Sequence, residues 1–191
     1  MLISLITMTA SAQNDVTKFL GIPVDGTKSE MIRKLKAKGF TSTDYDKETL
    51  IGEFNGAEAT LMIQTNNNKV WRIIVCYNNI SEQIAKTRFN NLCYQFQNNS
   101  KYLSTGIDYS IPDSEDISYE MTVNEKRYQG LYFQRTDKNL DIAKDDYSKH
   151  LFNNSFDENK IVWFTILQSI PMYSIGIYYE NGYNKANGED L

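Results

Sequence analysis

Two segments of the chain place apolar residues at the three- and four-residue spacing of an amphipathic helix. The first, residues 27–38, opens with Thr27 and has Glu30 three positions later, which is the pattern of a capping box. Gly39 follows as a left-handed C-terminal stop. In the second segment, residues 81–98, the apolar stripe consists of Ile84, Ala85, Phe89, Leu92, Cys93 and Phe96. The pattern predicts a helix in each segment.

Elsewhere the chain falls into short extended runs with the alternation typical of strands. Asn55-Gly56 and the three asparagines at 66–68 separate the first runs and are typical of hairpin turns. Strands are predicted over residues 49–55, 59–65, 69–77, 117–123, 128–135, 160–168 and 172–179.

The two halves of the chain follow the same plan, because each predicted helix is followed by a set of strands that ends in an aromatic-rich run. We therefore expect an α+β fold of two tandem units, each with one helix packed on an antiparallel sheet. The units are expected to share one continuous sheet, with both helices on one face. The expected boundaries are 13–79 for the first unit and 80–191 for the second, with a polar insertion at about 136–159.

The first dozen residues have the pattern of a secretion signal. A short apolar run, residues 2–8, precedes Ala10-Ser11-Ala12, which is an A-x-A cleavage signature. Residues 1–12 are therefore predicted to be a signal peptide, which implies a periplasmic or secreted protein; a buried first strand is the alternative. No segment reaches the roughly 20 apolar residues that a membrane helix needs, so no membrane span is expected.

Composition narrows the classes of partner. The 191 residues carry 24 acids and 20 bases, a net charge of -4, so no overall positive field is available to hold a phosphate backbone. Nucleic acid is not an expected partner. Hydrophobic residues make up 41% of the chain, which is sufficient for a packed core.

The chain has two cysteines, Cys76 and Cys93, an even number in a compartment that permits disulfides. A bridge between them is one interpretation, and two buried free thiols are the other. Neither a CxxC motif nor a Cys/His pair is present, so no zinc site is predicted.

Candidate catalytic residues are few. The only histidine, His150, lies in the polar insertion and has no nucleophile elbow to support it. The segment from Asp137 begins like a calcium loop but has Ile142 and Ser148 where an EF-hand requires glycine and glutamate. Paired loop carboxylates could act on a glycosidic bond, and the alternative is that they are solvated acid clusters. These residues are Asp113, Glu115, Asp116, Asp145 and Asp146. No cofactor, metal or catalytic residue is predicted.

Aromatic residues suggest a binding surface, since 13 Tyr, 9 Phe and 2 Trp exceed what a core of this size must hold. Alternation predicts which of them face outward. The predicted helix-covered side of the sheet includes Trp71, Ile73, Val75, Tyr77, Tyr173, Ile175, Ile177 and Tyr179. The opposite side then shows Arg72, Ile74, Tyr178, Trp163 and Thr165. Arg72, Trp163 and Tyr178 are the candidate residues for binding a protein or a glycan; the alternative is that the insertion or an N-terminal segment covers them.

Residues 19–28, 34–40 and 187–191 resemble a group of uncharacterised secreted proteins from anaerobic gut bacteria. The repeated plan is also similar in architecture to the tandem modules of β-lactamase inhibitor proteins and to small lipoproteins of outer-membrane assembly. These resemblances imply a non-catalytic interaction module that uses its sheet for contact, although fold alone does not imply function. A glycan hydrolase and an envelope-assembly factor remain the alternatives, the latter disfavoured because no cysteine follows the predicted cleavage site.

Overall fold

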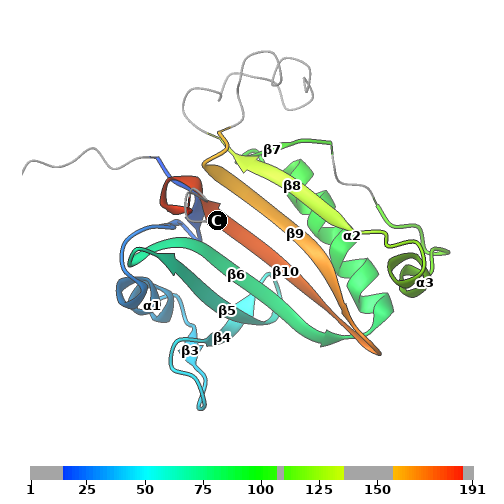
Figure 1. The fold of residues 1–191 in the computed structure, drawn as a ribbon, viewed down its shortest axis with the longest axis horizontal. Coiled ribbons are helices and arrows are strands. Elements are labelled where there is room, and N and C mark those ends of the chain that lie inside the picture. Colours follow the sequence, from blue (N-terminus) through cyan, green and yellow to red (C-terminus); the bar gives the residue numbers. More distant parts are fainter. Residues whose placement is uncertain (1–14, 107–109, 136–156, 187–191) are drawn as a thin grey trace, which may run out of the picture.

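The computed structural model describes residues 15–106, 110–135 and 157–186. Its main element is an eight-stranded antiparallel sheet with the strand order β3-β4-β5-β6-β10-β9-β8-β7 (Figure 1). Two short strands, β1 and β2, form a separate hairpin. The strands are β1 Lys18–Phe19, β2 Ile22–Pro23, β3 Thr41–Ser42, β4 Leu50–Phe54, β5 Ala57–Asn66, β6 Lys69–Ile80, β7 Tyr102–Ser104, β8 Gln129–Gln134, β9 Lys160–Ser169 and β10 Met172–Asn181. The protein is therefore an α+β protein built on a large antiparallel sheet.

Both predicted main helices are present. Helix α1, Lys28–Lys36, begins after Thr27, whose side chain accepts a hydrogen bond from the backbone N–H of Glu30 in the expected capping box. Helix α2, Glu82–Asn98, begins after Ser81, whose side chain accepts a hydrogen bond from the backbone N–H of Ile84. The left-handed stop after α1 is also confirmed, because Gly39 has a φ of 99°.

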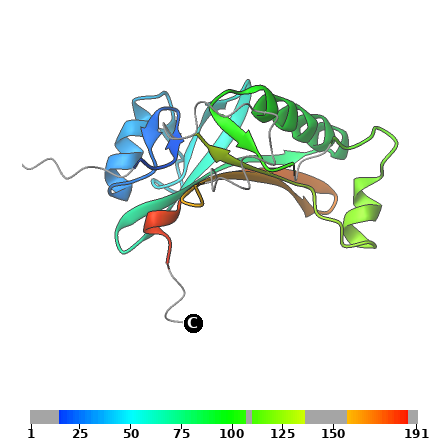
Figure 2. The same ribbon diagram turned by 90° about the horizontal axis from the view of Figure 1, so that it is seen from above.

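Figure 2 shows that α1 and α2 lie on the same side of the sheet. Helix α1 contacts β5 and β6, whereas α2 contacts β7, β9 and β10. In chain order, β3 to β6 follow α1 and β7 to β10 follow α2, and the last strands of the two series, β6 and β10, pair in the middle of the sheet. None of the helices in the described ranges is long and apolar enough to cross a membrane.

The core fills the space between these helices and the sheet. Val75 and Ile177, cross-strand partners in β6 and β10, are fully buried there. The ring of Phe89 from α2 lies 5.3 Å from that of Phe164 in β9. Burying each side chain of this size contributes about 1.5–3 kcal/mol. The alternation in β10 is as predicted, because Tyr173, Ile175, Ile177 and Tyr179 are all buried in the core.

The prediction for Trp71 is wrong. Arg72 pairs with Gln64 and Val70 pairs with Thr65, so Trp71 is an extra residue in β6, at a β-bulge. The bulge shifts the alternation by one residue, and Val70 takes the place in the core that the pattern assigned to Trp71. Ile73, Val75 and Tyr77, beyond the bulge, lie in the core as predicted.

The strand predicted over residues 117–123 is a helix instead, α3, Ile117–Thr122. The Asp116 carboxylate accepts a hydrogen bond from the backbone N–H of Tyr119 at 2.9 Å and so caps the helix. Ile117 and Met121, four residues apart, both pack against the core. Capping and this pair together outweigh the extended preference of the local sequence.

Cys76 and Cys93 are free and buried, so the structure has the thiol alternative rather than the bridge. Cys93 is a core residue of α2, whereas Cys76 alternates with the core residues Val75 and Tyr77 and therefore points to the other face of the sheet. The sheet lies between the two sulfurs and prevents a bridge. Burial raises the pKa of the Cys76 thiol, which favours its protonated form.

Candidate functional site

The face of the sheet opposite α1 and α2, called here the helix-free face, holds the residues singled out from the sequence. Trp163 and Tyr178 are cross-strand partners in β9 and β10, and their rings stack with centroids 3.9 Å apart and planes 8° from parallel. A Cβ added at Gly176 would lie 2.8 Å from the hydroxyl oxygen of Tyr178. The Tyr178 ring therefore leans over this glycine, which leaves it room.

Arg72 shares one carboxylate with Trp163 and lies over the Tyr178 ring, with its guanidinium carbon 5.4 Å from the ring centre. Its Nη2 lies 2.6 Å from Glu180 Oε1, and the indole N–H of Trp163 donates to the same oxygen at 2.7 Å. The guanidinium also donates to Gln64 Oε1 at 3.2 Å and lies 3.9 Å from the centre of the Trp71 ring. The structure thus brings Arg72, Trp163 and Tyr178 together around Glu180.

The Arg72–Glu180 pair is largely withdrawn from water. The Glu180 side chain is 7% exposed and that of Arg72 is 20% exposed. Arg72 Nε is buried and has no hydrogen-bond partner among the described residues. Burial, followed by the nearby Cys76, raises the pKa of Tyr178, so its hydroxyl remains a neutral hydrogen-bonding group.

An apolar row crosses this face through five neighbouring strands. Each member is the register partner of the next, from β5 across β6, β10 and β9 to β8. At the usual spacing between strands the row is about 19 Å long. The cross-strand row consists of Met62, Ile74, Tyr178, Trp163 and Leu131. Met62 is 38% exposed, and Leu167, four residues along β9 from Trp163 on the same face, is 44% exposed.

Glu180 was not among the residues predicted from the sequence. A signal for it existed, because it lies two residues after Tyr178 and strand alternation places both on one face. Its role as the common acceptor for β6 and β9 depends on the strand order, which no local pattern specifies.

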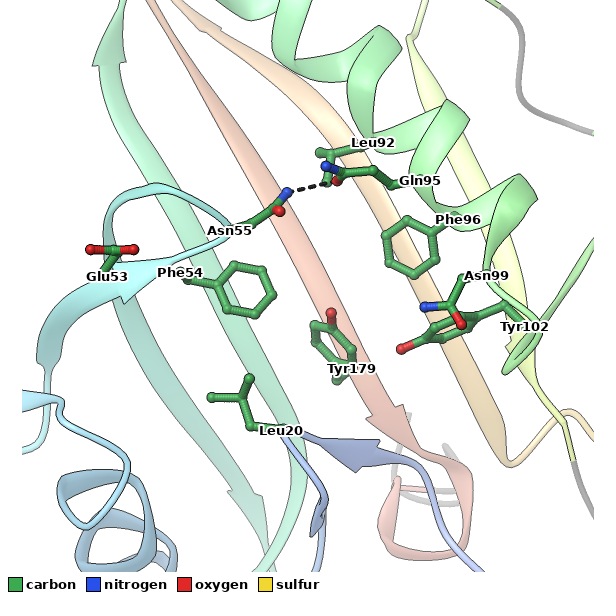
Figure 3. Close-up of a pocket in the computed structure, with 10 residues that line it drawn as sticks. All are labelled: Leu20, Glu53, Phe54, Asn55, Leu92, Gln95, Phe96, Asn99, Tyr102 and Tyr179. Carbon is green, nitrogen blue, oxygen red and sulfur yellow. Dashed lines mark hydrogen bonds between the residues drawn. The ribbon is translucent and has the colours of Figure 1, made fainter.

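On the helix side of the sheet the structure has a cavity of about 340 Å³, which the sequence pattern did not indicate (Figure 3). This apolar cavity is lined by Leu20, Glu53, Phe54, Asn55, Leu92, Gln95, Phe96, Asn99, Tyr102 and Tyr179. Asn55 Nδ2 donates to Gln95 Oε1 at 2.7 Å, which ties the β4–β5 turn to α2 at one end of the cavity. Its lining comes from segments far apart in the chain.

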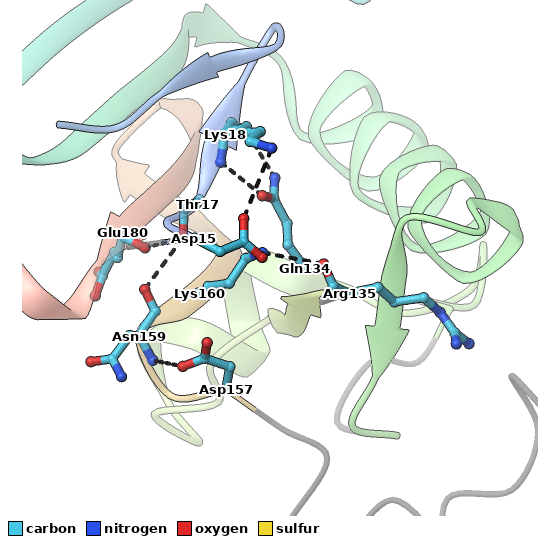
Figure 4. Close-up of polar contacts among 9 residues, drawn as sticks. All are labelled: Asp15, Thr17, Lys18, Gln134, Arg135, Asp157, Asn159, Lys160 and Glu180. Atoms are coloured by element: carbon cyan, nitrogen blue, oxygen red, sulfur yellow. Dashed lines mark hydrogen bonds and ion pairs between the residues drawn. The ribbon is translucent and has the colours of Figure 1, made fainter. Parts of the chain in front are cut away.

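A second cavity, of about 930 Å³, shares Leu20, Phe54, Asn99, Tyr102 and Tyr179 with the first. Four bases, Lys18, Lys101, Arg135 and Lys160, and one acid, Asp15, lie in the lining of this basic cavity. Lys160 is 3% exposed, and its Nζ lies 2.7 Å from Asp15 Oδ2 and donates to the Arg135 carbonyl at 3.2 Å (Figure 4).

Two of the predicted loop carboxylates, those of Glu115 and Asp116, are engaged in structural contacts. Lys126 Nζ lies 2.6 Å from Glu115 Oε1, which also accepts a hydrogen bond from the Tyr128 hydroxyl. The bond from Lys126, and after it the bond from Tyr128, lowers the pKa of Glu115. A general acid for glycoside cleavage needs a raised pKa instead. The Asp116 carboxylate caps α3. At Asp113 it is the backbone carbonyl that accepts a hydrogen bond, from Lys86 at 2.6 Å.

The remaining candidates, His150, Asp145, Asp146 and the calcium-like segment from Asp137, lie outside the described residues, as do predicted signal residues 1–12 and most of the polar insertion. In the three ranges that the structure describes, no three His, Cys, Asp or Glu residues gather where they could hold a metal ion. Comparison with protein-family models, curated proteins and solved structures finds no match. Function is therefore inferred from the geometry of this chain.

Proposed function

We propose that this protein is a non-catalytic interaction module, secreted or periplasmic, whose helix-free face binds another folded protein. The observation that carries the proposal is the cluster of Trp163, Tyr178 and Arg72 around Glu180, on the face that neither α1 nor α2 covers. Trp, Tyr and Arg are the residue types that most often contribute large binding energies at protein interfaces.

The cluster is held in place before any partner arrives. Glu180 fixes the indole of Trp163 and the guanidinium of Arg72, and stacking fixes the ring of Tyr178. Side chains that are already ordered lose little conformational entropy on binding. This preorganisation supports a surface that recognises a rigid partner.

A protein suits this face better than a glycan. Stacked rings 3.9 Å apart turn one flat face of Trp163 and one of Tyr178 toward each other, so those faces are not open to the flat side of a sugar ring. Apolar residues flank the rings in the cross-strand row, Ile74 beside Tyr178 and Leu131 beside Trp163. An apolar row about 19 Å long matches the apolar centre of a protein interface better than a sugar subsite.

The strand order supports a fold of two tandem units, residues 13–79 and 80–191. The order β3-β4-β5-β6 is followed by β10-β9-β8-β7, which reverses the chain order of the second series. The helix-free face then draws Arg72 from the first unit and Trp163 and Tyr178 from the second. Use of a shared sheet for contact is what the resemblance to β-lactamase inhibitor proteins implies.

The experiment is a capture from the envelope and culture fluid of the source organism, using the purified full chain as bait. The test bait carries Trp163→Ala and Tyr178→Ala. The control bait carries Tyr94→Ala and Tyr119→Ala, which remove two exposed rings from α2 and α3. Each captured protein is then purified, and its affinity for the three baits is measured by calorimetry.

The proposal predicts a partner whose affinity falls at least about thirtyfold with the test bait and is unchanged with the control bait. The far- and near-ultraviolet circular dichroism of each bait is recorded first. A milder variant, Trp163→Phe, is included in case the double variant unfolds. Equal affinity for all folded baits would reject the face as a protein-binding site, and retention only on glycan arrays would replace the protein by a glycan.

A further inference from the structure

The helix side of the sheet carries a second candidate binding region, which the proposed function does not use. The apolar and basic cavities share five lining residues, so they form one continuous region with two chemically different ends. From this geometry we propose that the region binds an anionic amphiphile, with the apolar group in the apolar cavity and the anionic head in the basic cavity.

The apolar end has the size and walls of a ligand site. Phe96, Leu92 and Tyr179 form buried walls, and Figure 3 shows the rings of Phe54 and Tyr102 on either side of Tyr179. A cavity of about 150 Å³ accommodates benzene, so about 340 Å³ provides room for roughly ten to fourteen carbon atoms. Pockets in this volume range with aromatic walls are typical of small-molecule sites.

The basic end supplies charge complementarity. Its lining has four bases and one acid, while the whole chain has a net charge of -4. Asp15 is shared by two lysines, since its carboxylate lies 2.7 Å from Lys160 Nζ and 3.9 Å from Lys18 Nζ. One carboxylate among four bases leaves this end with a net positive charge. The one acid of the apolar cavity, Glu53, lies apart from the aromatic rings in Figure 3.

The wall between the two ends stays neutral. Burial, followed by the neighbouring Tyr102 and Tyr77, raises the pKa of Tyr179 well above its ordinary value. Burial likewise raises the pKa of Tyr102. Both hydroxyls therefore remain protonated at neutral pH, and the shared wall presents no negative charge that would repel an anionic head.

Contacts among four segments fix the region. The Asn55–Gln95 hydrogen bond joins the β4–β5 turn to α2. The Gln134 side chain accepts from the Lys18 N–H at 2.7 Å and donates to the Lys18 carbonyl at 2.6 Å, which attaches β1 to the end of β8 (Figure 4). The cavities are thus largely formed before a ligand binds, as is usual for small-molecule sites.

A pair of fluorescent probes tests the proposal in the full chain. 8-Anilinonaphthalene-1-sulfonate is an anionic amphiphile, and N-phenyl-1-naphthylamine has the same rings without the sulfonate. The test variant is Lys18→Gln/Lys101→Gln, and the control is Lys34→Gln/Lys36→Gln on the exposed side of α1, which removes the same charge. We expect the test variant to bind the sulfonate probe with about fivefold lower affinity than the parent. Its affinity for the naphthylamine probe should be unchanged.

The apolar end is tested with Leu20→Asp, which puts a carboxylate between the cavities at a residue whose φ of 50° suits aspartate. Its control is Leu167→Asp, the same change on the helix-free face. Leu20→Asp should lower the affinity of both probes, and it should lower that of the sulfonate probe more. Decanoate and decyl phosphate should both displace the sulfonate probe, and the tighter competitor identifies the preferred head group; decyltrimethylammonium should not displace it.

Three outcomes would overturn the proposal. The first is the absence of saturable sulfonate binding to the folded parent. The second is equal affinity in the two lysine double variants, or displacement by the cationic amphiphile. The third is loss of the probe with Leu167→Asp or Trp163→Ala rather than Leu20→Asp, which would place it on the helix-free face. None of these outcomes depends on whether a protein binds that face.

Discussion

The two faces of the sheet are made by the same strands but differ in how their apolar residues are covered. On the helix side, α1 and α2 cover residues such as Val75 and Ile177. On the helix-free face, Ile74 and Cys76 are each only 7% exposed although neither helix covers them. Their shielding comes from neighbouring side chains of the cluster, such as Tyr178, whose hydroxyl lies over Gly176 beside Cys76. The proposed partner would therefore meet a surface formed by the cluster itself, on a face that neither main helix covers.

The polar groups of the two faces differ as well. Under the helices, rings pack against rings, as Phe164 does against Phe89 at 5.3 Å. On the helix-free face the rings are combined with a charged pair, Arg72 and Glu180. The first arrangement is typical of a core that stabilises the fold. The second orients specific groups and is typical of the centre of an interface.

The largest effect is expected from substitutions of two neighbours in β9. Phe164→Ala should lower the free energy of unfolding by about 3–5 kcal/mol, because it leaves a cavity among packed rings. Trp163→Ala should cost less than half of that, about 1–2 kcal/mol, since its stack with Tyr178 is partly exposed. Urea denaturation measures both. Equal losses would show that the helix-free face is a second core.

The second effect concerns the charged pair. Glu180→Gln should destabilise the fold by about 2 kcal/mol, because it leaves the Arg72 guanidinium mostly buried without its counter-charge. A second substitution, Arg72→Met, should recover most of the loss. The double-mutant cycle is followed by urea denaturation. If the losses in unfolding free energy of Glu180→Gln and Arg72→Met simply add in the double variant, the pair contributes nothing to the order of the face.

A smaller effect is expected at the start of α1, on the helix side. Thr27→Ala removes the oxygen that accepts the Glu30 N–H and should cost about 1 kcal/mol. Thr27→Ser, which keeps the oxygen, should cost little. Because the cap belongs to α1, on the opposite side of the sheet from the cluster, affinity for a captured partner should not change in the folded variant. A parallel loss of affinity would indicate that α1 also touches the partner.

The smallest effect is a pH dependence from Glu115, beside α3. Its pKa is lowered in the folded state, first by the bond from Lys126. The stability it contributes is therefore present above its unfolded pKa and is lost as the pH falls through the lower, folded value. Urea denaturation at several pH values measures the effect. Between pH 6 and 3 the free energy of unfolding should fall less steeply in Glu115→Gln than in the parent. An identical slope would mean that the Lys126 contact is not maintained in solution.

Much of the fold and part of the site were predictable because the responsible signals are local. Thr27 and Glu30 form their capping box within one helical turn. Strand alternation placed Trp163 and Tyr178 on one face. Alternation misplaces Trp71 because a bulge changes the period at one residue. It also predicts a strand over 117–123, where Asp116 caps a helix instead.

The rest depends on contacts between distant parts of the chain. Glu180 gains its role only when β6 and β9 lie on either side of β10. The apolar cavity needs Leu20, Phe54, Phe96 and Tyr179 from four separate elements. No periodicity in the sequence encodes such a meeting, because it is set by strand order and by the position of α2 over the sheet.

The most direct test of the central claim is whether solvent reaches Trp163 in the full chain. In a Trp71→Phe variant, Trp163 is the only tryptophan, and its accessibility is measured by acrylamide quenching of its fluorescence. The account predicts clear quenching by acrylamide, with an emission maximum between those of a buried and a free indole. Emission typical of a buried indole, with almost no quenching, would show that another part of the chain covers the helix-free face and would contradict its role in binding.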